Sequence, residues 1–82
     1  MEHVFTVRIP EGLHARPCVK LVDILKNFAP VQITANDHTL NDLSILELLL
    51  LKITYGSAVT IACAQPLSKT ALSALTQLFD NL

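Results

Sequence analysis

The stretch from residue 31 to residue 41 constrains the fold of this chain more than any other. Apolar and polar residues alternate from Val31 to Ala35, as in a half-buried strand, and Asn36-Asp37-His38 then supplies residues that tolerate a tight turn. Thr39-Leu40-Asn41 follows as the second arm of a short hairpin. Because a hairpin pairs its arms antiparallel, this stretch argues against a doubly wound parallel sheet.

The rest of the chain predicts two further strands and three helices. Alternation over residues 4–9 and 59–64 indicates the strands, since a strand turns every second side chain to the core. Apolar spacings of three and four predict a helix from about His14-Ala15 to Phe28. A middle helix over about residues 44–52 opens with Ser44 and Glu47 at capping-box spacing. Ser68 caps a last helix with an apolar stripe of Ala71, Leu72, Leu75, Leu78, Phe79 and Leu82.

The resulting order, β-α-β-β-α-β-α, is typical of the α+β class. Three helices on one face of a four-stranded antiparallel sheet form an open-faced sandwich, which is an economical way to cover one core. The chain has 82 residues, of which 51% are apolar and 16% charged. That is enough for one compact core and too little for two, so we predict a single domain over residues 1–82.

Charge and hydropathy exclude several kinds of partner. The formal net charge is -1, and no run of Lys or Arg could neutralise a row of phosphates, so we expect no nucleic-acid partner. The longest apolar stretch, residues 43–53, is well short of the roughly 18 residues that span a bilayer, and it predicts a buried helix rather than membrane insertion. We see no signal peptide at the N-terminus, and we expect a complete chain.

The cysteines and histidines suggest no metal or cofactor. Cys18 and Cys63 lack CxxC spacing and a secretory context, which favours two reduced and buried thiols. His3, His14 and His38 are dispersed and lack the neighbouring ligands that a metal site needs. We expect His3 and His38 to be surface residues.

The informative motif is Gly12-Leu13-His14-Ala15-Arg16-Pro17, at the junction between a strand-exit loop and a helix start. Free N–H groups and the positive dipole end of a helix favour an anion there. Arg16 adds a forked, charged donor suited to phosphate oxygens, and Pro17 fits the first helical turn. A neutral imidazole is a competent nucleophile toward phosphorus, so the motif predicts transient phosphorylation of His14.

This motif resembles the active-site motif of the HPr family of phosphocarriers, and the resemblance extends over nearly the whole chain. The order of elements, Ser44, Gly56 and the strand over 59–64 all fall where that family has its counterparts. The run Lys20-Leu21-Val22-Asp23-Ile24-Leu25 is similar to the nitrogen-related branch of the family. The resemblance therefore implies an HPr-like fold and a cytoplasmic, monomeric carrier of the phosphoenolpyruvate-dependent phosphotransferase system, whose best-known role is sugar transport.

The resemblance also implies partners and roles for residues. Enzyme I would phosphorylate His14 on Nδ1, Arg16 would steady the phosphoryl group, and an EIIA-type protein would accept it. Such a carrier is not a stand-alone enzyme. Some family members are phosphorylated by a regulatory kinase at the position of Ser44, although Ser44 already has a sufficient role as an N-cap. The implied docking face comprises Ala15, Pro17, Cys18, Lys20, Ile45, Leu46 and Glu47.

Several residues depart from the family pattern. Glu11 stands where a small or amide residue is common, and we expect its carboxylate to repel the incoming phosphoryl group and slow phosphorylation unless it points away. Cys18 stands where alanine is usual. Asp23 and Glu47 make the docking face less positive, which predicts a dedicated partner.

Two alternatives remain open at the level of sequence. The first is an HPr-like regulatory or docking module with weak or absent phosphotransfer, which Glu11, Asp23 and Glu47 keep open. The second is a small independent enzyme such as an acyl phosphatase, which would need a second group near His14 to activate water. The sequence shows no such group near the motif.

Overall fold

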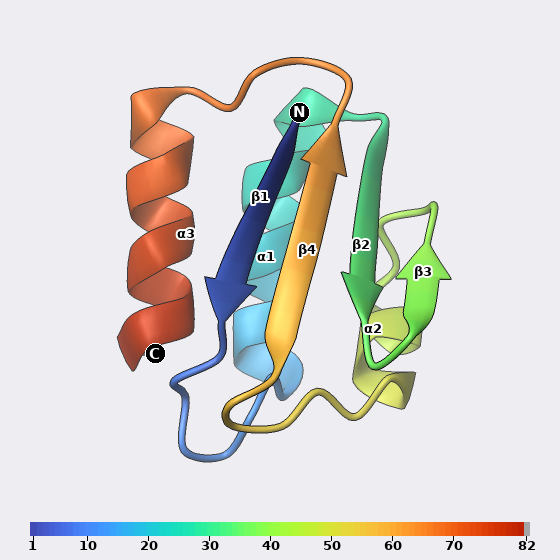
Figure 1. The fold of residues 1–82 in the computed structure, drawn as a ribbon, viewed down its shortest axis with the longest axis vertical. Coiled ribbons are helices and arrows are strands. Elements are labelled where there is room, and N and C mark those ends of the chain that lie inside the picture. Colours follow the sequence, from blue (N-terminus) through green and yellow to red (C-terminus); the bar gives the residue numbers. More distant parts are fainter. Residues whose placement is uncertain (82) are drawn as a thin grey trace.

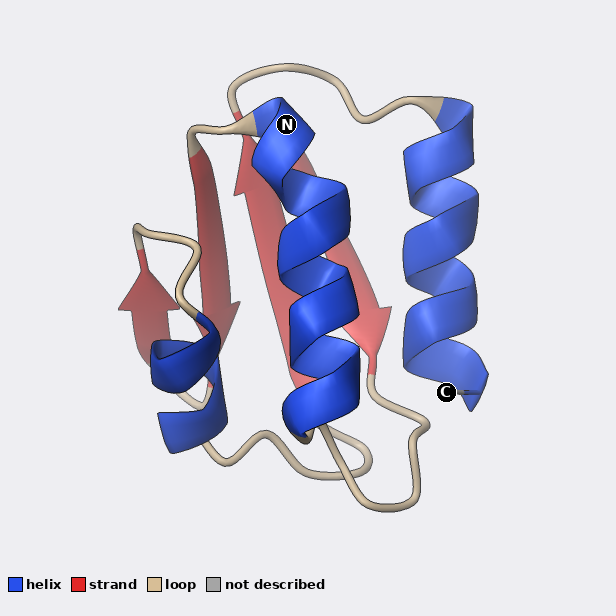
Figure 2. Cartoon of the chain, turned by 180° about the vertical axis from the view of Figure 1, so that it is seen from behind, coloured by secondary structure: helices blue, strands red, loops and turns tan. Residues whose placement is uncertain are grey.

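The computed structural model describes residues 1–81 and shows an open-faced sandwich. All strand pairs are antiparallel, in the sheet order β1-β4-β2-β3. The helices cover one face of the sheet and leave the other open (Figures 1 and 2). The predicted fold class is therefore confirmed. The elements are β1 (Glu2–Thr6), α1 (Ala15–Leu25), the 3-10 turn η1 (Lys26–Phe28), β2 (Val31–Ala35), β3 (His38–Leu40), α2 (Ile45–Leu50), β4 (Ala58–Cys63) and α3 (Lys69–Asn81).

The predicted hairpin is formed by β2 and β3. Asn36 and Asp37 lie between the strands with φ angles of 52° and 65°, the left-handed conformation that a tight two-residue hairpin requires. The hydroxyls of Thr34 and Thr39, which face each other across the pair, are 3.0 Å apart. The Asn36 side chain also donates to the carbonyl of Leu51, which ties the turn to the end of α2.

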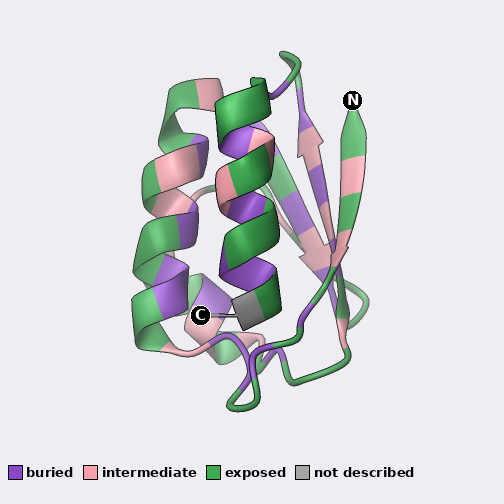
Figure 3. Cartoon of the chain, turned by 90° about the vertical axis from the view of Figure 1, so that its left-hand side faces the viewer, coloured by how far each residue is buried: buried purple, intermediate pink, exposed green. Residues whose placement is uncertain are grey.

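The core lies between the sheet and the helical layer. Ile33 and Ile61 of the two central strands are fully buried, as are Leu21 of α1 and Leu75 of α3. The buried residues follow one side of each helix (Figure 3), which is the amphipathic pattern that the sequence predicts. The stripe predicted for α3 is buried from Ala71 to Phe79, with Leu72 half-buried, and its last member, Leu82, lies outside the described residues.

The first strand lies nearer the N-terminus than predicted, over Glu2–Thr6 rather than residues 4–9. β1 ends at Thr6, although the alternation continues and both Val7 and Ile9 are buried. The chain leaves the regular ladder here because Val7 donates to the carbonyl of Ser57, ahead of β4, and Arg8 donates to the carbonyl of Phe79 in α3. Burial continues past the strand because the segment packs between the sheet and a helix.

The prediction of a buried middle helix is wrong for most of its length. Leu48 is fully buried, but Leu46 and Leu50 are 66% and 67% exposed. α2 is short and lies at the side of the helical layer next to α1 (Figure 2), so only one of its faces meets the core. No helix within residues 1–81 is long and apolar enough to cross a membrane.

Both predicted helix caps are present. The Ser44 hydroxyl accepts the amide of Glu47 at 3.3 Å, and the Ser68 hydroxyl accepts the amide of Ala71 at 3.1 Å. Each bond satisfies one of the orphan N–H groups of a first helical turn. The surface position expected for His3 is wrong, because this residue is half-buried and its Nε2 has no hydrogen-bond partner within the described chain.

Candidate functional site

His14 stands at the start of α1 as its N-cap residue. Its backbone is extended, with φ −93° and ψ −166°, and its carbonyl accepts the amide of Cys18 at 3.1 Å. The amides of Ala15 and Arg16 are the first two in the helix and have no acceptor inside it, while Pro17 has no N–H. The predicted place of His14 at the start of the helix, next in the chain to free backbone donors, is therefore confirmed.

Gly12 makes the turn that places His14. It has a φ of +77°, and a Cβ atom built on it would lie 2.5 Å from the backbone oxygen of Ile53. The next amide, that of Leu13, donates to the same oxygen at 2.9 Å. Only glycine allows the loop to approach the segment after α2 so closely. This contact therefore fixes the backbone position of His14.

Pro17 and Cys18 anchor the start of α1 to the core. Both side chains are buried, and the Cys18 thiol donates to the carbonyl of Leu13 at 3.7 Å. Burial raises the pKa of the Cys18 thiol to about 11, so it stays protonated and unreactive near neutral pH. The docking face implied by the resemblance therefore needs correction at Cys18, whose side chain offers no surface to a partner. Pro17 is also buried, and it borders the cavity beside His14.

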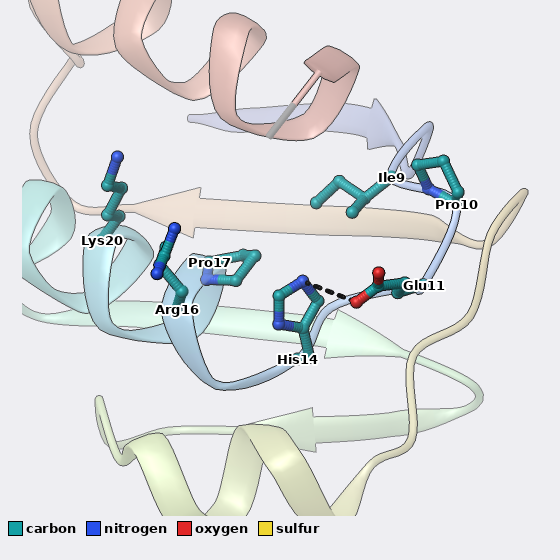
Figure 4. Close-up of a pocket in the computed structure, with 7 residues that line it drawn as sticks. All are labelled: Ile9, Pro10, Glu11, His14, Arg16, Pro17 and Lys20. Carbon is teal, nitrogen blue, oxygen red and sulfur yellow. Dashed lines mark ion pairs between the residues drawn. The ribbon is translucent and has the colours of Figure 1, made fainter.

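Glu11 faces the ring of His14. Its Oε2 lies 3.6 Å from His14 Nε2, and the two side chains are 80% and 43% exposed. Figure 4 shows the other ring nitrogen, Nδ1, on the side of the ring away from Glu11. The carboxylate does not point away from the histidine, which was the condition on which the expected repulsion depended.

The side chains around His14 line a shallow cavity of about 550 Å³. Arg16 and Lys20, one helical turn apart on α1, extend to the same side (Figure 4) and bring two cationic groups to it. Sequence reasoning missed Ile9 and Pro10 as part of this wall, since they were interpreted only as the end of a strand and a chain break. The full lining is Ile9, Pro10, Glu11, His14, Arg16, Pro17 and Lys20.

The other residues of the implied docking face are on the surface of α1 and α2. Ala15 and Lys20 are exposed, and Ile45 and Leu46 of the neighbouring helix are 36% and 66% exposed. Glu47 is also exposed. Val19 of α1 is 50% exposed and adds an apolar side chain that the sequence did not single out.

Two groups near this surface are already engaged. Asp23 forms an ion pair with Lys26 at 2.8 Å, which locally balances its charge. The half-buried Ser44 hydroxyl is occupied as the cap of α2. Across the part of the chain that the structure describes, no group of three or more His, Cys, Asp or Glu side chains is arranged to hold a metal ion.

Comparisons with known proteins agree on one family. The family model described as "PTS HPr component phosphorylation site" matches residues 1–81. Phosphocarrier protein HPr of Xylella fastidiosa is 32% identical over 82 residues, covering 99% of this chain and 92% of that protein. The multiphosphoryl transfer protein of Xanthomonas campestris is 29% identical over 79 residues, but the match covers only 9% of that much longer protein.

Solved structures show the same fold. The phosphocarrier HPr of Bacillus anthracis superposes with a TM-score of 0.76 at 29% identity, covering 96% of this chain and 95% of that one. HPr from Thermoanaerobacter tengcongensis gives a TM-score of 0.77 at 23% identity, covering 98% and 91% of the two chains. The second likeness supports the fold alone.

Proposed function

This chain belongs to the HPr family of phosphotransferase-system phosphocarriers, and we propose that His14 is the residue on which it carries the phosphoryl group. The observation that carries the proposal is the position of His14, half-exposed at the first turn of α1 beside the unpaired amides of Ala15 and Arg16. The nucleophile, His14, is therefore next to the backbone amides that can bind an anion. The assignment to the nitrogen-related branch stays a prediction.

The chemistry proposed for this site is phosphoryl transfer by positioning. The Nδ1 atom of a neutral His14 imidazole attacks the phosphorus of a donor protein. The two helix amides and the positive end of the α1 dipole then face the phosphoryl oxygens. Arg16 supplies a planar set of charged donors, and Lys20 adds a second cation on the same side. Transfer of this kind needs little covalent machinery beyond the nucleophile.

Enzyme I is the proposed donor and an EIIA-type protein the proposed acceptor, with the carrier acting as a monomer in the cytoplasm. The surface proposed to meet them joins the start of α1 to α2. It holds Ala15, Lys20, Ile45, Leu46 and Glu47, all of which are exposed. An apolar centre with charged neighbours suits transient docking of two different proteins in turn.

The test is transfer of labelled phosphate from phosphoenolpyruvate through enzyme I to this protein and on to an EIIA protein. We expect His14→Ala to abolish labelling, while His38→Ala, on the exposed hairpin strand β3, leaves it intact. The label should be labile in acid and stable in base, as a phosphohistidine is. Labelling that survives in His14→Ala would exclude this residue as the carrier.

The second candidate is an HPr-like docking module with weak or absent transfer. Glu47 on α2 and Glu11 beside His14 favour it, because two carboxylates reduce the positive charge of the surface. Asp23 supports it less than the sequence indicated, because Lys26 pairs with it. Binding of enzyme I without transfer of label would favour the module. Hydrolysis of acetyl phosphate independent of His14 would instead indicate an enzyme.

A further inference from the structure

The geometry points to a positioning role for Glu11: its carboxylate holds the His14 imidazole in the tautomer that is protonated on Nε2, which leaves the lone pair on Nδ1. This inference rests on the proposed function, because it names the residue that prepares the nucleophile. Glu11 lies just outside the motif that begins at Gly12, and its charge initially indicated only a repulsive effect.

The pairing is specific to one ring nitrogen. Oε2 of Glu11 lies 3.6 Å from Nε2, while Nδ1 lies on the opposite side of the ring (Figure 4). The backbone fixes the start of both side chains. The Gly12 amide donates to the carbonyl of Ile9 at 2.8 Å, which closes the turn that contains Glu11, and the His14 amide donates to the carbonyl of Gly12 at 3.0 Å. Among the side chains that line this cavity, Glu11 is the one carboxylate; the other charged groups are the cations Arg16 and Lys20.

The charges select the tautomer. A neutral imidazole carries one N–H and one lone pair, and the N–H is stabilised where an acceptor faces it. Glu11 offers an acceptor to Nε2, whereas Arg16 and Lys20 are donors without acceptor capacity. At 3.6 Å the carboxylate acts on Nε2 through its charge rather than through a formed hydrogen bond. That charge favours the tautomer with its proton on Nε2, and the lone pair on Nδ1 remains available for the phosphoryl group.

Glu11 also stabilises the charge that transfer creates. When the Nδ1 lone pair forms the bond to phosphorus, the bond from phosphorus to the donor's leaving group breaks, and its electron pair departs with that group. The Nε2 proton stays in place, so the ring becomes cationic beside the Glu11 carboxylate. An opposite charge already in position at that edge stabilises the developing cation. The phosphoryl group itself is attached at the opposite side of the ring, where repulsion from Glu11 is weaker.

The inference predicts both a spectroscopic and a kinetic effect. Nitrogen-15 NMR of ring-labelled protein at pH 8.5, well above the usual titration range of histidine near 6.5, reports which nitrogen is protonated. In Glu11→Ala, we expect the ratio of the Nε2-protonated to the Nδ1-protonated form of His14 to fall about two- to fivefold, the scale of an exposed charged pair. Glu11→Gln, which keeps a neutral acceptor, should fall between this variant and the wild type. Glu2→Gln, at the start of β1, removes a carboxylate elsewhere and should change nothing.

Labelling by enzyme I separates positioning from repulsion. Positioning predicts that Glu11→Ala is labelled about two- to fivefold more slowly than wild type, while repulsion predicts faster labelling. An unchanged tautomer ratio, or faster labelling, would overturn the inference and leave His14 as the carrier residue. Failure of wild-type His14 to take any label would overturn the proposed function, and with it the claim that Glu11 prepares a nucleophile.

Discussion

Replacing Gly12 with alanine tests whether the close approach of the loop to Ile53 holds the site in place. The added Cβ would lie 2.5 Å from the Ile53 oxygen and 3.1 Å from the Cα of Thr54, and both of these are backbone atoms that cannot rotate away. Relief requires the loop to move by roughly 0.9 Å, since ordinary van der Waals contacts of a Cβ atom begin at about 3.4 Å. That movement strains the hydrogen bond from Leu13 to Ile53.

Two terms make up the expected loss of stability. The φ of +77° costs an alanine about 1–2 kcal/mol. Weakening the hydrogen bond from Leu13 costs about 0.5–1.5 kcal/mol more. We therefore expect Gly12→Ala to lower the free energy of unfolding by about 2.5 kcal/mol, which corresponds to a fall in Tm of roughly 10–20 °C for a domain of this size.

Gly56 provides a matched control. It has a similar φ of +88°, but a Cβ built on it would meet nothing within 4 Å. Gly56→Ala should therefore lose only the conformational term, about 1–2 kcal/mol. Urea unfolding measures the free energy of unfolding of both variants, and the rate of labelling by enzyme I reports whether His14 is still in position. Equal losses in the two variants, or normal labelling of Gly12→Ala, would refute the argument that this contact positions His14.

Three further predictions concern single side chains. Burial raises the pKa of the Cys18 thiol from 9.0 to about 11, so the unfolded thiol ionises first and the free energy of unfolding should fall by about 2–3 kcal/mol between pH 9 and 11. Urea titrations should show a flatter pH dependence in Cys18→Ala. Ser44→Ala should cost about 1 kcal/mol in thermal unfolding, and Ser44→Asp, which can still cap α2, should cost less. Arg16→Lys keeps the charge but loses the planar donors, so labelling by enzyme I should slow about tenfold, and an unchanged rate would contradict the proposed phosphate contact.

The sheet could be predicted because its signals are local. The turn at Asn36 and Asp37 identifies a hairpin without reference to the rest of the chain, and alternation identifies the core face of β4. The exposure of α2 could not be predicted in this way. Apart from Glu47 its sequence is apolar, and only the placement of α2 at the side of the layer decides that Leu46 and Leu50 remain outside.

In the candidate site too, the local features were predictable from the sequence and the long-range features were not. Residue types and spacing were enough to predict that His14 stands at a helix start beside Arg16, because capping and helix donors are local effects. The direction of the Glu11 side chain was not predictable, since it depends on the left-handed turn at Gly12 and on the approach to Ile53, far along the chain. The burial of Cys18, by contrast, was predicted from the sequence and is confirmed.

Residues of the core and residues of the candidate site alternate along one short segment, residues 13–18. Leu13, Pro17 and Cys18 are buried, and between them His14 is half-exposed and Arg16 exposed. The groups proposed to meet a phosphoryl group are therefore held by neighbours whose burial stabilises the whole domain. Ordering of the site is achieved by folding itself, so little further ordering entropy has to be lost when a partner docks. That is an advantage for a small protein that must present one atom in the same position first to a donor and then to an acceptor.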